Sequence, residues 1–109
     1  MMKSAPGTTE PASEVLSNEM DELFEVIADL KSASESAAFL RDLCTIGELR
    51  AMSGRWQVAL LLDQGLHYLE IARRTGASTA TVTRVSTWLR FGSGGYRSML
   101  DRRREAQAR

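Results

Sequence analysis

The stretch YLEIARRTGASTATVTRV, residues 68–85, restricts the possible folds more than any other part of the chain. Two helices joined by a tight turn need apolar residues at fixed distances from a residue that can close the turn. Ile71 stands five positions before Gly76, and Val82 and Val85 stand six and nine positions after it. The glycine can adopt a positive φ at little cost, and the two valines then point from one face of the second helix back at the first. This spacing predicts a helix-turn-helix.

Two further positions bear on the predicted helix-turn-helix, residues 68–89. Ala72 lies where the two helix axes should approach, so a larger side chain there would push them apart. Thr75, at the end of the first helix, departs from the pattern, because an aliphatic side chain is more usual at this position. The same spacing would also fit a helical hairpin in an ordinary α-helical bundle. The residues that face outward decide between these two interpretations.

The outward face of the second predicted helix is small, uncharged and able to form hydrogen bonds. A helix face that meets only solvent usually carries Glu, Lys or Gln, whereas small polar side chains allow close approach to the floor of a DNA groove. Arg73 and Arg74 end the first helix, where they can reach phosphates, and Arg84 is expected to contact phosphate or to read guanine. We therefore expect duplex DNA as the partner. The residues expected to read base edges are Ser78, Thr79, Ala80, Thr83 and Thr87.

The first half of the chain has helical periodicity and lacks the alternating pattern of β-strands. Ser32 with Glu35, and Thr45 with Glu48, have the spacing of capping boxes that open a second and a third helix. Gly65 suits the position just after the third helix. The inward faces expected for these three helices hold Met20, Leu23, Phe24, Ile27 and Leu30, then Ala38, Phe39 and Leu43, and then Leu49, Met52, Trp56 and Leu60.

The C-terminal segment contains three glycines, in FGSGGY, which should end the second helix of the motif at Gly92. They do not form a dinucleotide-binding loop, because no strand precedes them. We expect one last short helix that holds Tyr96, Met99 and Leu100, followed by RRREAQAR, which should fray into solvent. The predicted fold class is therefore all-α.

The length of 109 residues favours one domain, although a chain this short often completes its core by oligomerising. Residues 1–18 are rich in Ser, Thr, Pro, Gly and Ala and hold few large apolar side chains, so we expect a disordered N-terminal tail. Residues 19–105 are expected to form the helical DNA-binding domain.

The charge is divided unevenly between the two parts of the chain. Residues 1–48 hold three basic and ten acidic residues, whereas residues 49–109 hold eleven arginines and four acidic residues. This asymmetry indicates a polyanionic partner for the second part. The alternative interpretation of the asymmetry is that these charges simply lie on helix faces that meet solvent.

Several functions are disfavoured by what the sequence lacks. His67 and Cys44 are the only residues of their kinds, and no metal-ligand spacing or set of catalytic partners is present, so we expect no enzyme activity, metal or cofactor. Cys44 is typical of a core thiol in a reducing cytosol. His67 is typical of a solvent-facing loop residue, with a pH sensor as the alternative. No apolar stretch matches a membrane span or a signal peptide, so we expect a cytoplasmic protein without a membrane partner.

The segments RDLCTIGEL, TGASTATVTRV and FGSGGYRSML resemble the YerC/YecD branch of the Trp repressor superfamily, and the similarity covers roughly residues 20–101. The resemblance implies a six-helix subunit and an intertwined homodimer, in which the first three helices and the last form a shared core. The helix-turn-helix would project from that core. A two-fold dimer would place its recognition helices roughly 34 Å apart, about one DNA turn, and would favour a palindromic site.

The resemblance also bears on a small ligand. In the Trp repressor, tryptophan binds between the third helix and the recognition helix, and Thr45, Arg55 and Arg84 match positions that help to hold it. The ligand-binding relative has glycine where this chain has Val85, and serine where it has Trp88. Both changes fill space, so the sequence predicts a vestigial site and no tryptophan corepressor. Arg55 and Arg84 would then serve an internal ion pair or a phosphate contact.

Two interpretations of Trp88 follow. Its indole would either occupy the space that a free indole needs, or pack against the last helix near Tyr96. We also expect Tyr68 and Tyr96 to have packed rings with exposed hydroxyls.

The sequence supports three hypotheses of function. The leading one is a sequence-specific transcriptional regulator that binds duplex DNA as a homodimer without tryptophan. The second is a protein-interaction module with a degenerate helix-turn-helix, whose acidic first half docks a basic partner. The third is a repressor gated by a different small ligand, such as an acid held by Arg55 and Arg84.

Overall fold

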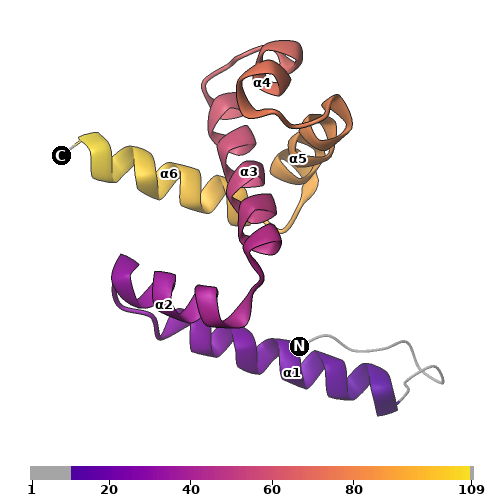
Figure 1. Cartoon of the computed structure of the whole chain (residues 1–109), viewed down its shortest axis with the longest axis vertical. Coiled ribbons are helices and arrows are strands. Elements are labelled where there is room, and N and C mark those ends of the chain that lie inside the picture. The colour runs from indigo at the N-terminus through magenta and orange to yellow at the C-terminus, as the bar shows by residue number, and fades with distance from the viewer. Residues whose placement is uncertain (1–10, 109) are drawn as a thin grey trace. The chain divides into compact units, whose positions relative to one another are not determined.

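The structure of the chain is a computed structural model that describes residues 11–108. All regular secondary structure in this range is helical, in six helices, which confirms the predicted all-α fold class. The described residues form two compact units, divided between Leu43 and Cys44. Figure 1 labels the six helices and colours them along the chain, from indigo for α1 to yellow for α6.

The first unit contains α1 (Pro11–Ala28) and α2 (Ala33–Leu43). Helix α1 begins at Pro11, inside the segment 1–18 that is expected to be a disordered tail. Proline is well suited to the first position of a helix, because its φ is already helical and its missing N–H would have no partner there. Residues 1–10 lie outside the described residues.

The start of α2 follows its predicted cap only in part. The Ser32 hydroxyl accepts a hydrogen bond from the backbone N–H of Glu35 at 3.1 Å, as a capping box requires. The Glu35 carboxylate accepts from the backbone N–H of Lys31 at 2.9 Å, one residue before the position that a capping box uses. The Glu35 carboxylate and the Ser32 hydroxyl therefore each accept a hydrogen bond from a backbone N–H at the start of α2.

The apolar side chains of the first unit are largely uncovered. Phe24 is 57% exposed and Leu43 is 51% exposed, and Ala38 is also exposed. Only Phe39, of the three α2 residues expected to face inward, is half-buried. Within this unit Ala38 and Leu43 are therefore not covered as expected, and neither is Phe24.

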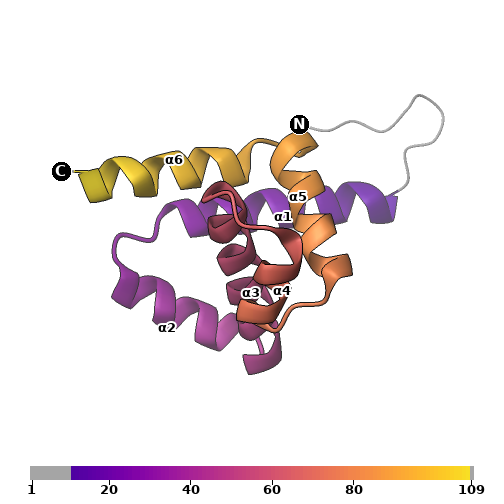
Figure 2. The same ribbon diagram turned by 90° about the horizontal axis from the view of Figure 1, so that it is seen from above.

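The second unit contains α3 (Ile46–Asp63), α4 (Tyr68–Thr75), α5 (Thr79–Phe91) and α6 (Gly95–Ala108). Helices α4, α5 and α6 all pack against α3, which lies among them in Figure 2. The core takes at least one residue from each of the four helices, and consists of Val58, Ala59, Ile71, Val82, Val85 and Leu100.

Helix α3 has both ends that the sequence predicts. The Thr45 hydroxyl accepts from the backbone N–H of Glu48 at 3.0 Å, and the Glu48 carboxylate accepts from the backbone N–H of Thr45 at 2.8 Å. This completes a capping box. Gly65, just after the helix, has a φ of 87°, a conformation that favours glycine.

Helix α6 is longer than the sequence analysis predicts. It continues through RRREAQ to Ala108, where fraying is expected. The reason is attachment to α3: Arg97 donates to the Asp63 carboxylate at 2.8 Å, and Arg104 donates to the other oxygen of Asp63. In addition, the rings of Trp56 and Tyr96 stack with their centroids 6.5 Å apart.

Candidate nucleic-acid interface

Helices α4 and α5 form the helix-turn-helix that the spacing predicts. Ile71 and Val82 are fully buried and Val85 is 1% exposed, so the three apolar positions meet in the core. Gly76 ends α4 with a φ of 76°, and its backbone N–H donates to the carbonyl of Ala72 at 2.9 Å. A glycine at this position allows the chain to turn at once into α5.

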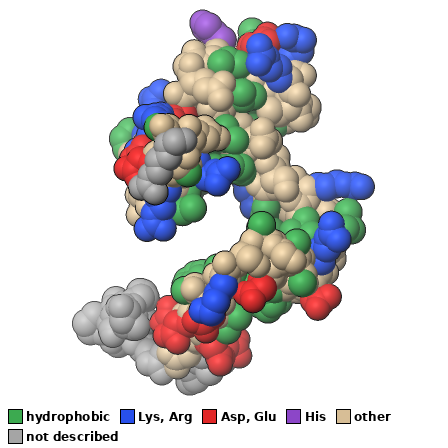
Figure 3. All heavy atoms as spheres, turned by 90° about the vertical axis from the view of Figure 1, so that its left-hand side faces the viewer, with side chains coloured by type: hydrophobic (Ala, Val, Ile, Leu, Met, Phe, Trp, Pro, Cys, Tyr) green, Lys and Arg blue, Asp and Glu red, His purple; other side chains and the backbone are tan. Residues whose placement is uncertain are grey.

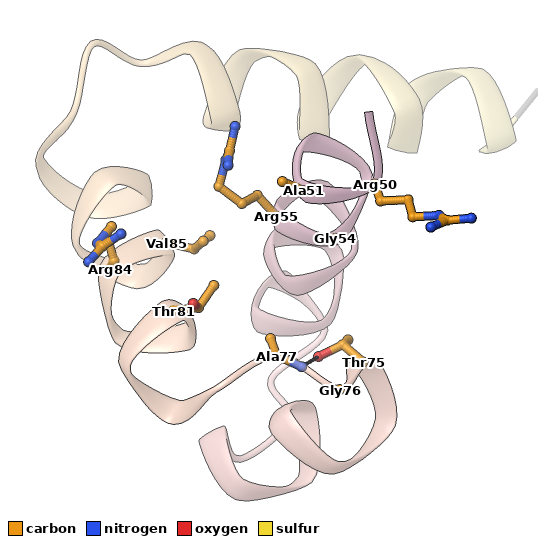
Figure 4. A pocket seen from close by; sticks show the side chains of 10 residues that line it. All are labelled: Arg50, Ala51, Gly54, Arg55, Thr75, Gly76, Ala77, Thr81, Arg84 and Val85. Atoms are coloured by element: carbon orange, nitrogen blue, oxygen red, sulfur yellow. Dashed lines mark hydrogen bonds between the residues drawn. The ribbon is translucent and has the colours of Figure 1, made fainter. Parts of the chain in front are cut away.

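Thr75, the residue that departs from the usual pattern, has a role in this turn. Its hydroxyl donates to the carbonyl of Ile71 at 2.8 Å and accepts from the backbone N–H of Ala77 at 3.1 Å. The second of these bonds is drawn in Figure 4. The hydroxyl therefore connects the last turn of α4 to the loop, which an aliphatic side chain could not do.

A second polar connection joins α4 directly to α5. The Tyr68 hydroxyl donates to the Ser86 hydroxyl at 2.5 Å, and Ser86 is buried. The expectation that the Tyr68 hydroxyl is exposed is therefore wrong, because Ser86 provides a partner on the inner side of α5. Side-chain hydrogen bonds at both ends of α4 therefore accompany the apolar contacts of the motif.

The five residues expected to read base edges are all exposed on α5 or at its start. The Ser78 hydroxyl is the N-cap of α5, accepting from the backbone N–H of Thr81 at 3.1 Å. The Thr87 hydroxyl donates to the carbonyl of Thr83 at 3.0 Å. Thr79 and Thr83 make no side-chain hydrogen bond with any described residue, and Ala80 presents a methyl group. The face is small and polar, as expected.

The two arginines at the end of α4 are both bound to Glu70. Arg73 donates to the two oxygens of the Glu70 carboxylate, through Nε at 3.2 Å and Nη2 at 2.5 Å. Arg74 donates through Nε to Oε2 at 2.8 Å. Hydrogen bonds from Arg73 and then from Arg74 lower the pKa of Glu70 to about 2, so the carboxylate is ionised at neutral pH.

A cavity of about 280 Å³ lies between α3, α5 and the turn of the motif, as Figure 4 shows. Thr81 and Val85 point from α5 toward α3, and Arg50 points away from α5. Arg55 and Arg84 belong to the lining, but their guanidinium groups point in different directions. The lining consists of Arg50, Ala51, Gly54, Arg55, Thr75, Gly76, Ala77, Thr81, Arg84 and Val85.

The structure brings together only part of the predicted vestigial ligand site. Arg55, Arg84 and Val85 line this cavity, whereas the Thr45 side chain is used in the capping box of α3. Trp88 lines a separate apolar groove together with Trp56, Tyr96 and Met99. Of the two interpretations of Trp88, the one that places it near Tyr96 on the last helix agrees with this arrangement.

One expectation for Arg55 and Arg84, an internal ion pair, is not met in the described part of the chain. Within the described residues neither forms an ion pair, so the internal ion pair that the sequence left open is not formed there. Both guanidinium groups remain available to an external anion.

Glu70 is the residue at this surface that the sequence analysis missed. It precedes Arg73 by three positions and Arg74 by four, which is the spacing of ion pairs along a helix. That spacing was the signal that could have revealed it. Figure 3 shows the wider distribution of charge, with acidic side chains gathered over α1 and basic ones predominating over α3 to α6.

Comparison with known proteins agrees with this geometry. The family model described as Trp repressor protein matches residues 18–104. The chain belongs to the Trp repressor family. It is 43% identical over 89 residues to Bacillus subtilis (strain 168) YerC, a match that covers 82% of this chain and 86% of YerC.

Two crystal structures of Trp repressor-like proteins are similar to this chain. A TrpR-like protein from Eubacterium eligens superposes with a TM-score of 0.74 at 41% identity, over 78% of this chain and 88% of its own. A candidate Trp repressor from Staphylococcus aureus superposes with a TM-score of 0.77 at 38% identity, over 88% of this chain and 96% of its own. These likenesses confirm the Trp repressor-like subunit fold.

Other kinds of site are not seen in the described part of the chain. No three His, Cys, Asp or Glu side chains there are grouped so that they could hold a metal ion. None of the described helices is both long enough and apolar enough to cross a membrane.

Proposed function

We propose that this protein is a sequence-specific transcriptional regulator that binds duplex DNA as a homodimer through α4 and α5. The observation that carries the proposal is the exposed face of α5, on which Thr79, Ala80 and Thr83 are small and uncharged. A face of this kind can approach base edges closely. Val82 and Val85, on the opposite face of the helix, are buried in the core. The protein would act in the cytoplasm by binding DNA, without catalysing a reaction.

Affinity and sequence preference would come from different side chains. Arg73, Arg74 and Arg84 are exposed and would meet phosphates, so binding should weaken steeply as salt is added. Thr79, Ala80 and Thr83 would contact base edges, with methyl groups suited to thymine. Since the face lacks Asn and Gln, bridging water and DNA shape would supply part of the specificity.

The homodimer is supported by the uncovered apolar surface of the first unit. Phe24 is 57% exposed, Met20 is 54% exposed and Ile27 is 41% exposed, all on α1. A second copy of the chain would cover such a surface. Two copies would present two recognition helices to a palindromic site.

A repressor gated by a small anion is the second candidate. It is favoured by the cavity of about 280 Å³ that Arg55 and Arg84 line, since neither arginine has an acidic partner within the described residues. A thermal-shift screen of metabolite acids would identify such a ligand, and Arg55→Ala should abolish the shift. Tryptophan is not the proposed ligand, because Val85 stands where the ligand-binding relative has glycine.

Selection of bound sequences from random duplexes tests the main proposal. We expect a palindromic consensus whose half-sites are about one DNA turn apart. A well-folded protein that enriches no sequence, and whose binding to duplexes does not respond to salt, would instead favour the protein-interaction module.

A further inference from the structure

Glu70 gives the proposed DNA-binding surface an anion of its own. Its side chain is 33% exposed, and its carboxylate binds the guanidinium groups of both Arg73 and Arg74, whose side chains are 71% and 54% exposed. All three residues lie on α4, so no other element is needed to bring them together. The phosphate of a duplex would have to approach arginines that already hold a carboxylate.

The two arginines are held in different ways. Arg73 uses both Nε and Nη2 on the carboxylate, which is the pair of donors that binds a phosphate in bidentate geometry. Arg74 uses only Nε. Arg73 therefore cannot bind phosphate in this way until it releases Glu70, whereas Arg74 keeps its terminal nitrogens for another acceptor.

Release of Glu70 is feasible because the ion pairs are exposed. Exposed ion pairs contribute little to stability, since water screens them and both side chains lose freedom. The low pKa of Glu70, about 2, means that the carboxylate is not neutralised by a proton at neutral pH. It remains a full negative charge next to both arginines whenever DNA approaches.

We propose that Glu70 is an internal competitor of DNA phosphate for Arg73 and Arg74, and that it limits the sequence-independent affinity of the helix-turn-helix. This inference rests on the proposed DNA-binding function and assigns a restraining role within it. Duplexes that offer phosphates alone gain little from Arg73 while Glu70 holds two of its donors, whereas Arg74 can still contact a phosphate through its terminal nitrogens.

The test compares Glu70→Gln with Asp101→Asn. Both variants lose one negative charge from an ion pair with an arginine on the same helix, and Asp101 lies on α6, outside the helix-turn-helix. Each variant and the wild type would be titrated with a random-sequence duplex over a range of salt concentrations, with helicity and thermal unfolding as checks of folding.

We expect Glu70→Gln to bind the random duplex more tightly at low salt. One added phosphate contact steepens the salt slope by about 0.9, so the variant should lose about 3.5-fold more affinity than the wild type between 50 and 200 mM salt. Asp101→Asn should show at most a small change. Adding Arg73→Ala and Arg74→Ala should remove the gain, because competition for these arginines is its only source.

Other results would overturn the inference. Weaker binding by Glu70→Gln would mean that the carboxylate positions the arginines for DNA, and a gain that persists without the arginines would mean a general effect of charge. If Glu70→Gln and Asp101→Asn gained the same affinity for the random duplex, the gain would likewise be a general effect of charge. If the wild type itself binds no duplex at any salt concentration, the proposed function fails and not only the role of Glu70.

Discussion

At the scale of single residues, the proposed function assigns contacts with the DNA backbone and contacts with the bases to different side chains of the helix-turn-helix. Arg74 lies at the end of α4, whereas Thr79 and Thr83 lie on the exposed face of α5. Phosphate contacts carry no sequence information, and groove contacts do. We predict that Arg74→Ala weakens binding to every duplex alike, with a salt slope shallower by about one, and that Thr83→Val changes the preferred sequence.

Binding curves on a selected site and on a scrambled duplex would check this prediction. Arg103→Ala on α6 is the matched control, since it removes the same charge from an exposed helix position outside the motif. An Arg74→Ala protein that changed its sequence preference but kept its affinity for scrambled duplexes would show that the two roles are assigned wrongly.

At the scale of helices, the hydrogen bond from Tyr68 to Ser86 joins the two helices of the motif. Tyr68→Phe keeps the ring and removes the donor, which leaves the buried Ser86 hydroxyl without this partner. We expect a loss of about 1 kcal/mol in the free energy of unfolding, the usual contribution of such a bond. Chemical denaturation would measure it. Tyr96→Phe makes the same change on α6, where the ring stacks on Trp56, and equal losses in both variants would contradict a specific role for the Tyr68 bond.

The attachment of α6 to α3 should depend on pH. Hydrogen bonds from Arg97 are the largest cause that lowers the pKa of Asp63, followed by those from Arg104, while burial opposes them. Because the folded-state pKa is depressed below the ordinary 3.8, the ion pairs stabilise the fold above that pH and are lost as the pH falls through the folded-state value.

We therefore predict that Asp63→Asn unfolds at a lower temperature than the wild type at pH 7, and that the difference shrinks as the pH falls below 3.8. Thermal unfolding followed by circular dichroism over this range would measure both. Glu70 also titrates near pH 2, but it is present in both proteins, so its contribution cancels in the comparison. A difference that stays constant down to pH 2 would contradict the assignment.

The helix-turn-helix could be predicted from sequence because its contacts are short-range and its spacing is strict. Ile71, Gly76 and Val85 have the burial and the φ that their positions predict. What the sequence could not reveal depends on contacts between distant residues. Asp63 and Arg104 are 41 positions apart, and their ion pair helps to explain why α6 continues where fraying was expected.

Trp88 shows the same limit among the residues expected to form a vestigial ligand site. The position of Trp88 in the sequence places it on α5 but does not determine on which side of the helix its indole lies. The structure sets it on a groove with Trp56 and Tyr96, away from the cavity of Arg55 and Arg84. That separation depends on where α6 packs, which periodicity does not determine.

At the scale of the whole molecule, the uncovered apolar side chains predict self-association. Phe24 is 57% exposed on α1, in the apolar surface that a second copy would cover, whereas Leu69 is 74% exposed on α4, in the helix-turn-helix and outside that surface. We expect sedimentation equilibrium to show a dimer at micromolar concentration, and Phe24→Asp to shift it toward monomer. Leu69→Asp is the control, since it changes an exposed apolar residue of the helix-turn-helix. A compact wild-type monomer at this concentration would contradict the prediction.

The last prediction is that DNA binding needs no tryptophan. A corepressor acts by binding one conformation of the DNA-binding helices better than another, so its effect requires a site that discriminates between them. In this chain Val85 points from α5 toward α3, is 1% exposed, and is part of the core that holds the motif in place. Packing of Val85 in the core therefore holds α5 in place without a ligand.

Affinity for a selected site would be measured with and without millimolar tryptophan. We expect no change, and a gain of tenfold or more, equivalent to about 1.4 kcal/mol, would overturn the prediction. Val85→Gly is the informative companion, because it removes a buried side chain and introduces glycine within a helix. It should cost about 2–4 kcal/mol of stability. If this variant then gained affinity for DNA when tryptophan was added, Val85 would be the residue that closes the site.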